Sequence, residues 1–152
     1  MALDALLKSN KDAILKRWFD LLLETYPAES ARFIREEKDG FINPVGASIA
    51  REIDSIFDAL VAGKKPDEAL DCIIRIRAVQ DFTPSRAIGF VFSLKKAIRD
   101  ELSAELSKLE VLKDFLAIES RIDELALLAT DFYMKCREQI YAIRLNELKA
   151  GR

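Results

Sequence analysis

The sequence predicts an all-α protein that folds as one globular domain of about six to seven helices over residues 1–152. Apolar residues recur at the three- and four-residue spacing of helices, and no segment shows the alternation of a β-strand. Only five glycines and four prolines interrupt the chain. Half of the residues are hydrophobic and a third are charged, which is typical of a chain that buries its own core.

The prolines indicate where helices begin. Each stands just before a stretch with helical spacing, and the four are Pro27, Pro44, Pro66 and Pro84. Proline suits the first helical position because its missing N–H would have no partner there. Asn43 and Thr83 precede two of the prolines and are residue types that cap helix N-termini. Asp67 and Glu68 follow Pro66 and favour the positive end of a helix dipole.

The first predicted helix ends near Tyr26, and a short helix follows from about Ala28 to Glu37. The apolar face of the first helix is formed by Ile14, Trp18, Leu21 and Leu22. The helix after Pro44 stops at Gly63, and its apolar stripe is formed by Ile49, Ile53, Ile56, Phe57 and Leu60. The helix after Pro84 buries a similar stripe, and Gly89 within it indicates a close backbone approach.

A long C-terminal helix is predicted over about 109–148. Its apolar residues recur with a 3.5-residue period, at Val111, Phe115, Ile118, Ile122, Leu125, Ala129, Phe132 and Cys136. The segment LALLATDFYM, residues 125–134, is apolar nearly all round, so we expect it to lie in the interior. After Cys136 the helix becomes amphipathic and could project and pair with a second copy. The candidate dimer face comprises Ile140, Tyr141, Leu145 and Leu148.

Composition excludes several classes of function. The formal net charge of -2 argues against a general nucleic-acid binder, and the absence of histidine removes most metal, haem and nucleophilic templates. Cys136, Met134 and Tyr133 are possible haem ligands, but a core cysteine needs no iron to explain it. The glycines stand alone, so no phosphate-binding loop is predicted. We therefore expect no catalytic residue, no metal and no cofactor.

The compartment follows from the same patterns. Charges are dense from Met1 to Leu21, so no signal peptide is predicted, and no apolar run is long enough to enter a membrane. Cys72 and Cys136 lie in apolar surroundings without C-x-x-C spacing, and we expect two reduced, buried thiols. The sequence favours a cytoplasmic protein.

An unusual segment precedes Ala87, because Arg75 and Arg77 stand among apolar residues there. On a helix these two positions lie about 200° apart, so both cannot face the same solvent side. At least one guanidinium is expected to lie against protein, and a buried arginine needs an acidic or carbonyl partner. Asp131 poses the same problem with opposite charge inside the apolar segment. We expect Arg75 or Arg77 to pair with Asp131.

Two other acids, Asp81 and Asp123, compete for this pairing. The residues of this candidate buried polar cluster are Arg75, Arg77, Gln80, Asp81, Asp123 and Asp131. The favoured explanation is an ion pair that fixes the register of two helices. The alternatives are a polar floor beneath a pocket for a small apolar ligand, with Phe82, Phe90 and Phe92 nearby, or a solvent-facing arginine that binds a protein partner.

Four blocks of the sequence resemble the RsbRD N-terminal domain family. They are WFDLLLETYP, FINPVG, IIRIRAVQDFTPSRAIGFVFSLKKAI and DFYMKCREQIYAIRLNE, and the resemblance runs from about Asn10 to Glu147. The family takes its name from co-antagonists of the kinase RsbT, the input modules of bacterial stressosomes. The blocks that begin IRIRAVQDFTPS and DFYMKCRE, in that order, are more specific than any helical periodicity.

This resemblance implies a non-enzymatic sensory or regulatory domain. Related input domains are similar to globins without haem and pair as dimers through helices near the chain ends, so the expected architecture is a haem-free globin-like fold or a helical bundle. In the signalling relatives the C-terminal helix leads into a phosphorylated STAS domain, whereas this sequence ends at Arg152. The resemblance therefore implies a homodimer that contacts an unknown regulatory partner.

Overall fold

A computed structural model describes residues 2–151, and this part of the chain is helical without a β-strand, which confirms the predicted all-α class. Seven α-helices and one short 3-10 helix follow one another here. They are α1 (Ala2–Ser9), α2 (Lys11–Leu23), α3 (Ala28–Glu36), α4 (Pro44–Ala62), α5 (Asp67–Val79), α6 (Pro84–Glu101), η1 (Glu105–Ser107) and α7 (Leu109–Ala150). The helix that precedes residue 10 was not predicted from the sequence.

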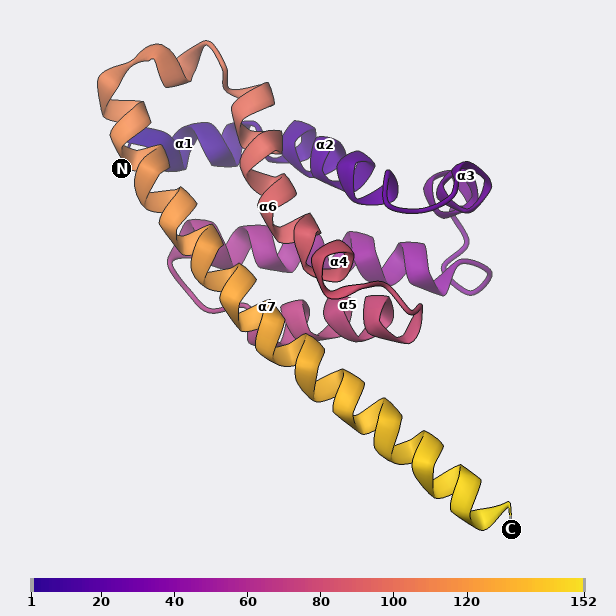
Figure 1. The fold of residues 1–152 in the computed structure, drawn as a ribbon. Coiled ribbons are helices and arrows are strands. Elements are labelled where there is room, and N and C mark those ends of the chain that lie inside the picture. Colours follow the sequence, from indigo (N-terminus) through magenta and orange to yellow (C-terminus); the bar gives the residue numbers. More distant parts are fainter. Residues whose placement is uncertain (1, 152) are drawn as a thin grey trace.

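Helix α7 sets the shape of the molecule. It is 42 residues long and crosses the body formed by α1 to α6, and its C-terminal turns project beyond that body (Figure 1). At 1.5 Å per residue, it measures about 63 Å. Helix α6 packs against both α2 and α7, and α5 packs against α7 and α4. The predicted long C-terminal helix is therefore present as one continuous element.

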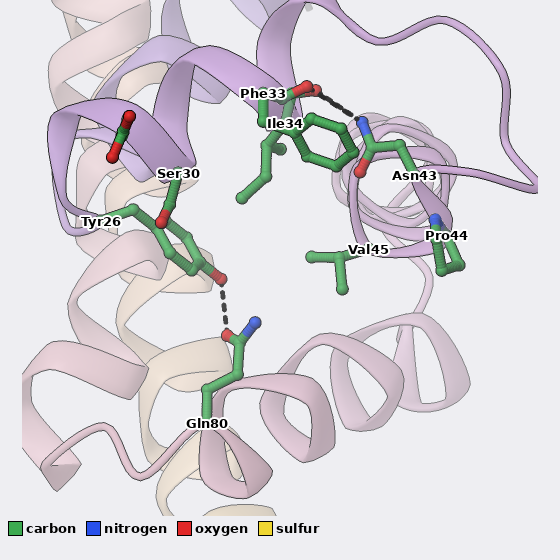
Figure 2. A pocket seen from close by; sticks show the side chains of 9 residues that line it. Tyr26, Ser30, Phe33, Ile34, Asn43, Pro44, Val45 and Gln80 are labelled. Atoms are coloured by element: carbon green, nitrogen blue, oxygen red, sulfur yellow. Dashed lines mark hydrogen bonds between the residues drawn. The ribbon is translucent and has the colours of Figure 1, made fainter.

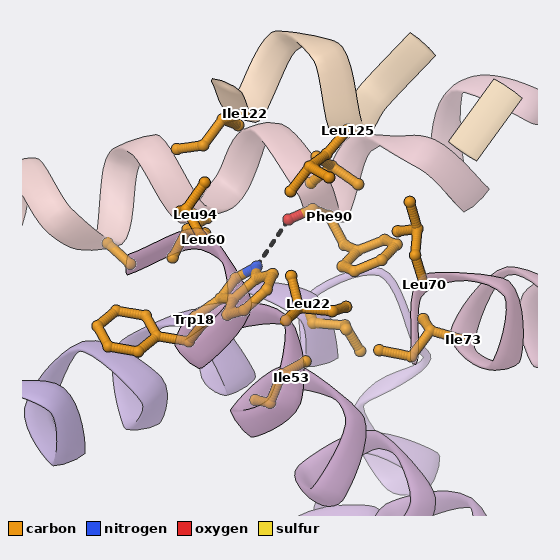
Figure 3. Close-up of a cluster of buried hydrophobic side chains, with 14 of the residues drawn as sticks. Trp18, Leu22, Ile53, Leu60, Leu70, Ile73, Phe90, Leu94, Ile122 and Leu125 are labelled. Atoms are coloured by element: carbon orange, nitrogen blue, oxygen red, sulfur yellow. Dashed lines mark hydrogen bonds between the residues drawn. The ribbon is translucent and has the colours of Figure 1, made fainter. Parts of the chain in front are cut away.

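The core lies where α2, α4, α5, α6 and α7 meet (Figure 3). Trp18 of α2 is 1% exposed, and its ring stacks on Phe90 of α6 with centroids 6.1 Å apart. The indole Nε1–H of Trp18 donates to the carbonyl oxygen of Phe90 at 2.7 Å. Since a buried indole N–H without an acceptor costs stability, this hydrogen bond lets the largest side chain of the protein occupy the centre.

The prolines mark helix starts as predicted. Pro44 and Pro84 are the first residues of α4 and α6, and Pro27 and Pro66 stand one residue before α3 and α5. Thr83 precedes α6 but its side chain makes no capping hydrogen bond, so that expectation was wrong.

Asn43 caps α4 and also fastens α3 to it. Its side-chain oxygen accepts from the backbone N–H of Gly46 at 3.0 Å, as predicted for an N-cap. Its side-chain nitrogen donates to the carbonyl oxygens of Ile34 at 3.0 Å and Glu37 at 3.1 Å, at the end of α3. A Cβ at Gly46 would collide with this amide. The side chain of Asn43 is buried because it satisfies backbone groups of two helices at once.

Two helices end in a left-handed residue. Gly63 follows α4 with φ 71°, and Asp81 follows α5 with φ 61°. Beyond Asp81, the N–H of Phe82 donates to the carbonyl oxygen of Arg77, while the N–H of Asp81 donates to that of Ala78. This is the Schellman pattern, in which glycine is the usual left-handed residue. Asp81 therefore adopts a backbone conformation that is unfavourable in free energy for residues other than glycine.

Three further expectations need correction. The segment 125–134 is not buried all round, because Leu127 is 70% exposed and Met134 is 53% exposed. No atom of the described chain comes within 4 Å of a Cβ added to Gly89, so the predicted close approach does not occur within this molecule. Cys136 is buried but Cys72 is only half-buried, and both are free of disulfides.

Candidate functional site

The side chain of Arg77 lies in the protein interior at the end of α5. It is 0% exposed, whereas most charged residues of the chain reach solvent. Its Nε donates to the carbonyl oxygen of Ala87 at 3.1 Å, and Nη2 donates to that of Arg86 at 2.6 Å. Nη2 also donates to the hydroxyl of Thr25 at 3.1 Å. The guanidinium thus joins the end of α5 to the first turn of α6 and the segment after α2.

Aromatic rings surround the same guanidinium. Its central carbon lies 4.4 Å from the ring centre of Phe82, and 5.7 Å from those of Tyr26 and Phe90. The faces of aromatic rings attract cations, and the attraction grows where water is excluded. Burial lowers the pKa of Arg77 and raises that of Tyr26, although the nearby Arg77 cation opposes the rise at Tyr26.

The predicted partners of this arginine are elsewhere. Asp131 is exposed on α7, so the expected ion pair with Arg75 or Arg77 is wrong. Ala129 and Tyr133 face the body. Asp131 lies two residues from each, about 200° around α7, and therefore faces away from the body. The backbone carbonyl oxygens at the start of α6, and not a carboxylate, accept hydrogen bonds from the Arg77 guanidinium.

The other members of the predicted cluster are at the surface. Arg75 is exposed and pairs with Asp71 at 3.1 Å, one turn earlier on α5. Asp123 is exposed and pairs with Lys95 of α6 at 2.6 Å. Gln80 and Asp81 are also exposed, and only Gln80 is close to the Arg77 site, through its bond to Tyr26.

Sequence reasoning missed four residues that build the site: Thr25, Tyr26, Arg86 and Tyr133. The hydroxyl of Tyr133, on α7, donates to the carbonyl oxygen of Phe82 at 2.7 Å and so fastens the turn after α5 to α7. The guanidinium of Arg86 donates to the carbonyl oxygen of Thr25 at 2.7 Å. Arg86 stands nine residues after Arg77 and lies on a different helix, so helical spacing in the sequence could not indicate that the two are close.

A second network joins this turn to the projecting part of α7. The carboxylate of Asp81 lies 3.2 Å from Nη1 of Arg137 and 3.8 Å from Nη2 of Arg144. Nη2 of Arg137 donates to the hydroxyl of Tyr141 at 2.7 Å, and its guanidinium lies 4.9 Å from the ring centre. Asp81 therefore contacts α7, but through residues that we had not paired with it.

Helix α7 carries a second apolar stripe, which faces away from the core. Its members lie between 40% and 70% exposed and are Leu109, Leu112, Leu116, Leu127, Met134, Tyr141, Leu145 and Leu148. At 100° per residue they share one side of the helix, about 130° from the stripe that packs on the body. We call these eight residues the outer stripe.

The outer stripe contains three of the four residues of the predicted dimer face. Tyr141, Leu145 and Leu148 belong to it and are exposed. Ile140 is half-buried and packs against the core cluster, so it lies on the other side of α7. Four members, Leu127, Met134, Tyr141 and Leu148, are spaced at seven-residue intervals.

Two neighbouring surface cavities flank Tyr26. The first, of about 480 Å³, is lined mainly by apolar side chains of α3 and the start of α4, including Phe33, Ile34 and Val45. Figure 2 shows the hydroxyl of Tyr26 and the side chain of Gln80 at one end of this space, joined by a 2.7 Å hydrogen bond. The second cavity, of about 510 Å³, is lined by Thr25, Tyr26, Pro27, Gln80, Phe82 and Arg86. Tyr26 and Gln80 line both.

Comparison with known proteins identifies the family. A model of the RsbT co-antagonist protein rsbRD N-terminal domain matches residues 12–148, which is nearly the whole chain. The chain belongs to this family. Its members are signalling input domains, so the family implies interactions with other proteins. The match includes almost all of α2 and α7 and every helix between them, and therefore both the Arg77 site and the outer stripe.

One relative of this rsbRD N-terminal domain is an uncharacterized protein of the archaeon Archaeoglobus fulgidus. The two are 28% identical over 144 residues, which cover 93% of this chain and 86% of the relative. No solved structure matches the domain.

The described residues offer neither a membrane-spanning helix nor a cluster of metal ligands. Across residues 2–151, every helix is either too short or too polar to span a lipid bilayer. The same residues contain no group of three or more cysteine, aspartate or glutamate side chains placed to hold a metal ion.

Proposed function

We propose that this domain is a non-enzymatic regulatory module that acts by pairing with a second copy of itself through α7 and by contacting a further regulatory protein. The observation that carries the proposal is the outer stripe. An apolar stripe that recurs from Leu109 to Leu148, with a gap between Leu116 and Leu127, is costly to leave in water, and such stripes are typical of helix pairs. Membership of a family of signalling input domains supports the same conclusion.

Charges beside the outer stripe favour a second copy as the occupant. Arg137 and Arg144 flank the stripe on one side, and the acidic Glu124, Asp131 and Glu138, together with Lys135, flank it on the other. In a parallel pair of helices, the flank on one side of the stripe lies opposite the partner's flank on the other side. Two identical α7 helices aligned in parallel would thus place basic side chains against acidic ones.

The proposed mechanism is a shift between two packings of the paired α7 helices when a ligand or partner favours one of them. Asp81 supports this because it joins the turn after α5 to Arg137 and Arg144 on the projecting part of α7. A change in the conformation of that turn would alter the contacts of Asp81 with Arg137 and Arg144, and so the packing of the paired α7 helices.

Light scattering with charge substitutions tests which face pairs. Tyr141→Glu and Leu145→Glu would each bury a carboxylate in the pair, so we expect dimerisation to weaken by about a hundredfold or more. Ile143→Glu is the matched control, because Ile143 is 58% exposed on the same turns but lies about 160° around α7 from Leu145. A strictly monomeric parent chain, or equal weakening by Ile143→Glu, would refute the proposal.

A second candidate function is the sensing of a small apolar ligand. The sequence placed such a ligand within the helical core, but the centre of that core is filled by Trp18, Phe57 and Phe90, each at most 1% exposed. The specific observation that favours this function is the apolar cavity beside Tyr26, between α3 and the start of α4. Calorimetric titration with a short-chain alcohol tests it; the absence of binding would leave the regulatory proposal intact.

A further inference from the structure

We infer that the two cavities at Tyr26 together bind a monocarboxylate with an apolar tail, its carboxylate beside Arg86 and near the buried charge of Arg77. The inference rests on the second candidate function and names the class of ligand. It is independent of dimerisation, because the outer stripe lies on α7 and these cavities lie among α2 to α6.

The positive charge of Arg77 has no carboxylate to balance it. Within residues 2–151 no aspartate or glutamate oxygen lies within 4 Å of its nitrogens, although the side chain is 0% exposed. Its Nη1 is buried and makes no hydrogen bond to any described residue. A buried guanidinium usually has a paired anion, since desolvation of a charge is otherwise costly. An anionic ligand would supply what the chain itself does not.

The buried charge of Arg77 lies behind the wall of the second cavity, because Thr25, Tyr26 and Phe82 line that cavity and contact the guanidinium. Nε and Nη2 are taken up by the carbonyl oxygens of Ala87 and Arg86 and by the hydroxyl of Thr25. Nη1 therefore points away from the first turn of α6. The ring centre of Tyr26 lies 5.7 Å from the same guanidinium carbon, its hydroxyl bonds to Gln80, and Tyr26 lines both cavities.

Arg86 supplies a second cation at the mouth of the site. It is exposed, lines the 510 Å³ cavity and lies 5.4 Å from the ring centre of Phe82. No acidic side chain is among the described residues that line this cavity. Arg86 stands in the first turn of α6, where the positive end of the helix dipole also favours an anion. Carboxylate oxygens form strong, charge-assisted hydrogen bonds with a guanidinium.

The neighbouring cavity fits the apolar part of the ligand. This first cavity, of about 480 Å³, shares Tyr26 and Gln80 with the second, and Phe33 and Val45 border it (Figure 2). Glu29 also lines this cavity and would repel a carboxylate there. The ligand is therefore oriented, with its carboxylate at the arginine end and its tail between α3 and α4.

Isothermal titration with sodium octanoate and with octan-1-ol tests the assignment, since the two probes share a tail and differ in the carboxylate. We expect octanoate to bind at least about tenfold more tightly than octan-1-ol. Arg86→Gln should remove most of that preference, whereas Arg99→Gln, an equal charge change at an exposed position of α6, should retain it. Substituting Arg77 would disturb the fold, so its role is tested in the unaltered protein by nitrogen-15 NMR. We expect the Nε–H signal of Arg77 to shift when octanoate is added and to stay in place when octan-1-ol is added.

Each outcome decides the inference. Equal affinity for the two probes would show a ligand cavity without carboxylate recognition, so the second candidate function would survive and this inference would fail. If neither probe binds, both fail. Octanoate binding that is insensitive to Arg86→Gln, or that leaves the Arg77 signal unmoved, would overturn the placement of the carboxylate.

Discussion

Among the described residues, Arg77 shows how a charged side chain can be buried without a carboxylate beside it. It stands in the last turn of α5, where the helix dipole favours a cation. Three oxygen acceptors and three aromatic rings stabilise its guanidinium, and one nitrogen remains without a partner. The arrangement joins three segments, but the desolvation of the charge offsets much of this stabilisation.

This balance predicts different effects for two substitutions of Arg77. Arg77→Met keeps most of the buried volume and removes an uncompensated charge, so we expect a loss below about 2 kcal/mol in the free energy of unfolding. Arg77→Ala also opens a cavity and should cost about 3–5 kcal/mol. Urea denaturation measures both. Asp131→Asn is the control and should stay within about 0.5 kcal/mol, because Asp131 is exposed. Equal losses for Met and Ala would contradict this reading.

Tyr26 gives the Arg77 site a dependence on alkaline pH. Burial raises the pKa of Tyr26, so the folded protein holds the phenolic proton more firmly than the unfolded chain does. The stability that this contributes is complete below the ordinary tyrosine pKa of about 10 and is lost as the pH rises through the folded value. Tyr26→Phe should therefore lose less stability than the parent between about pH 9 and 11. Thermal melts across this range test it, with Tyr141→Phe as an exposed control; identical slopes for parent and Tyr26→Phe would contradict it.

At the scale of elements, Asn43 decides how α3 meets α4. Its amide accepts from Gly46 and donates to Ile34 and Glu37, so it needs both an oxygen and an N–H₂ group. At an ordinary N-cap, aspartate and asparagine are equivalent because only the acceptor matters. Here a carboxylate would face two carbonyl oxygens instead of donating to them.

Asn43→Asp should therefore destabilise the protein by at least about 2 kcal/mol at neutral pH, more than an ordinary cap exchange. Acidification should restore part of the loss, because a protonated carboxyl can donate again. Chemical denaturation at neutral and acidic pH measures both effects. Asn146→Asp, on the projecting part of α7, is a useful control, since Asn146 is exposed. A harmless Asn43→Asp would show that the donor side of Asn43 is dispensable.

The helices themselves were largely predictable from local signals. Proline starts, the stop at Gly63 and the apolar spacing placed α3, α4 and α6 close to their observed bounds. Asp81 gave no such signal. Its left-handed backbone conformation is set by the geometry of the turn after α5, and its neighbours in sequence do not indicate it. Likewise the partners of Arg77 come from segments 9 to 52 residues away, so helical spacing identified a buried arginine but assigned it the wrong partner.

At the scale of the molecule, α7 serves two surfaces. One stripe packs on the body, and the members of the outer stripe, from Leu109 to Leu148, are exposed to solvent. The sequence pattern of residues 125–134 predicted apolar residues all round, but periodicity cannot distinguish a helix enclosed by its own chain from one that is covered on one side. A helix with two apolar stripes and a projecting end is suited to assembly.

The molar mass of the unaltered chain in solution tests the central claim most directly. Sedimentation equilibrium over micromolar concentrations should give twice the mass of one chain, with a dissociation that depends on concentration. A single species with the mass of one chain at every concentration would contradict the claim that the outer stripe of α7 pairs with a second copy.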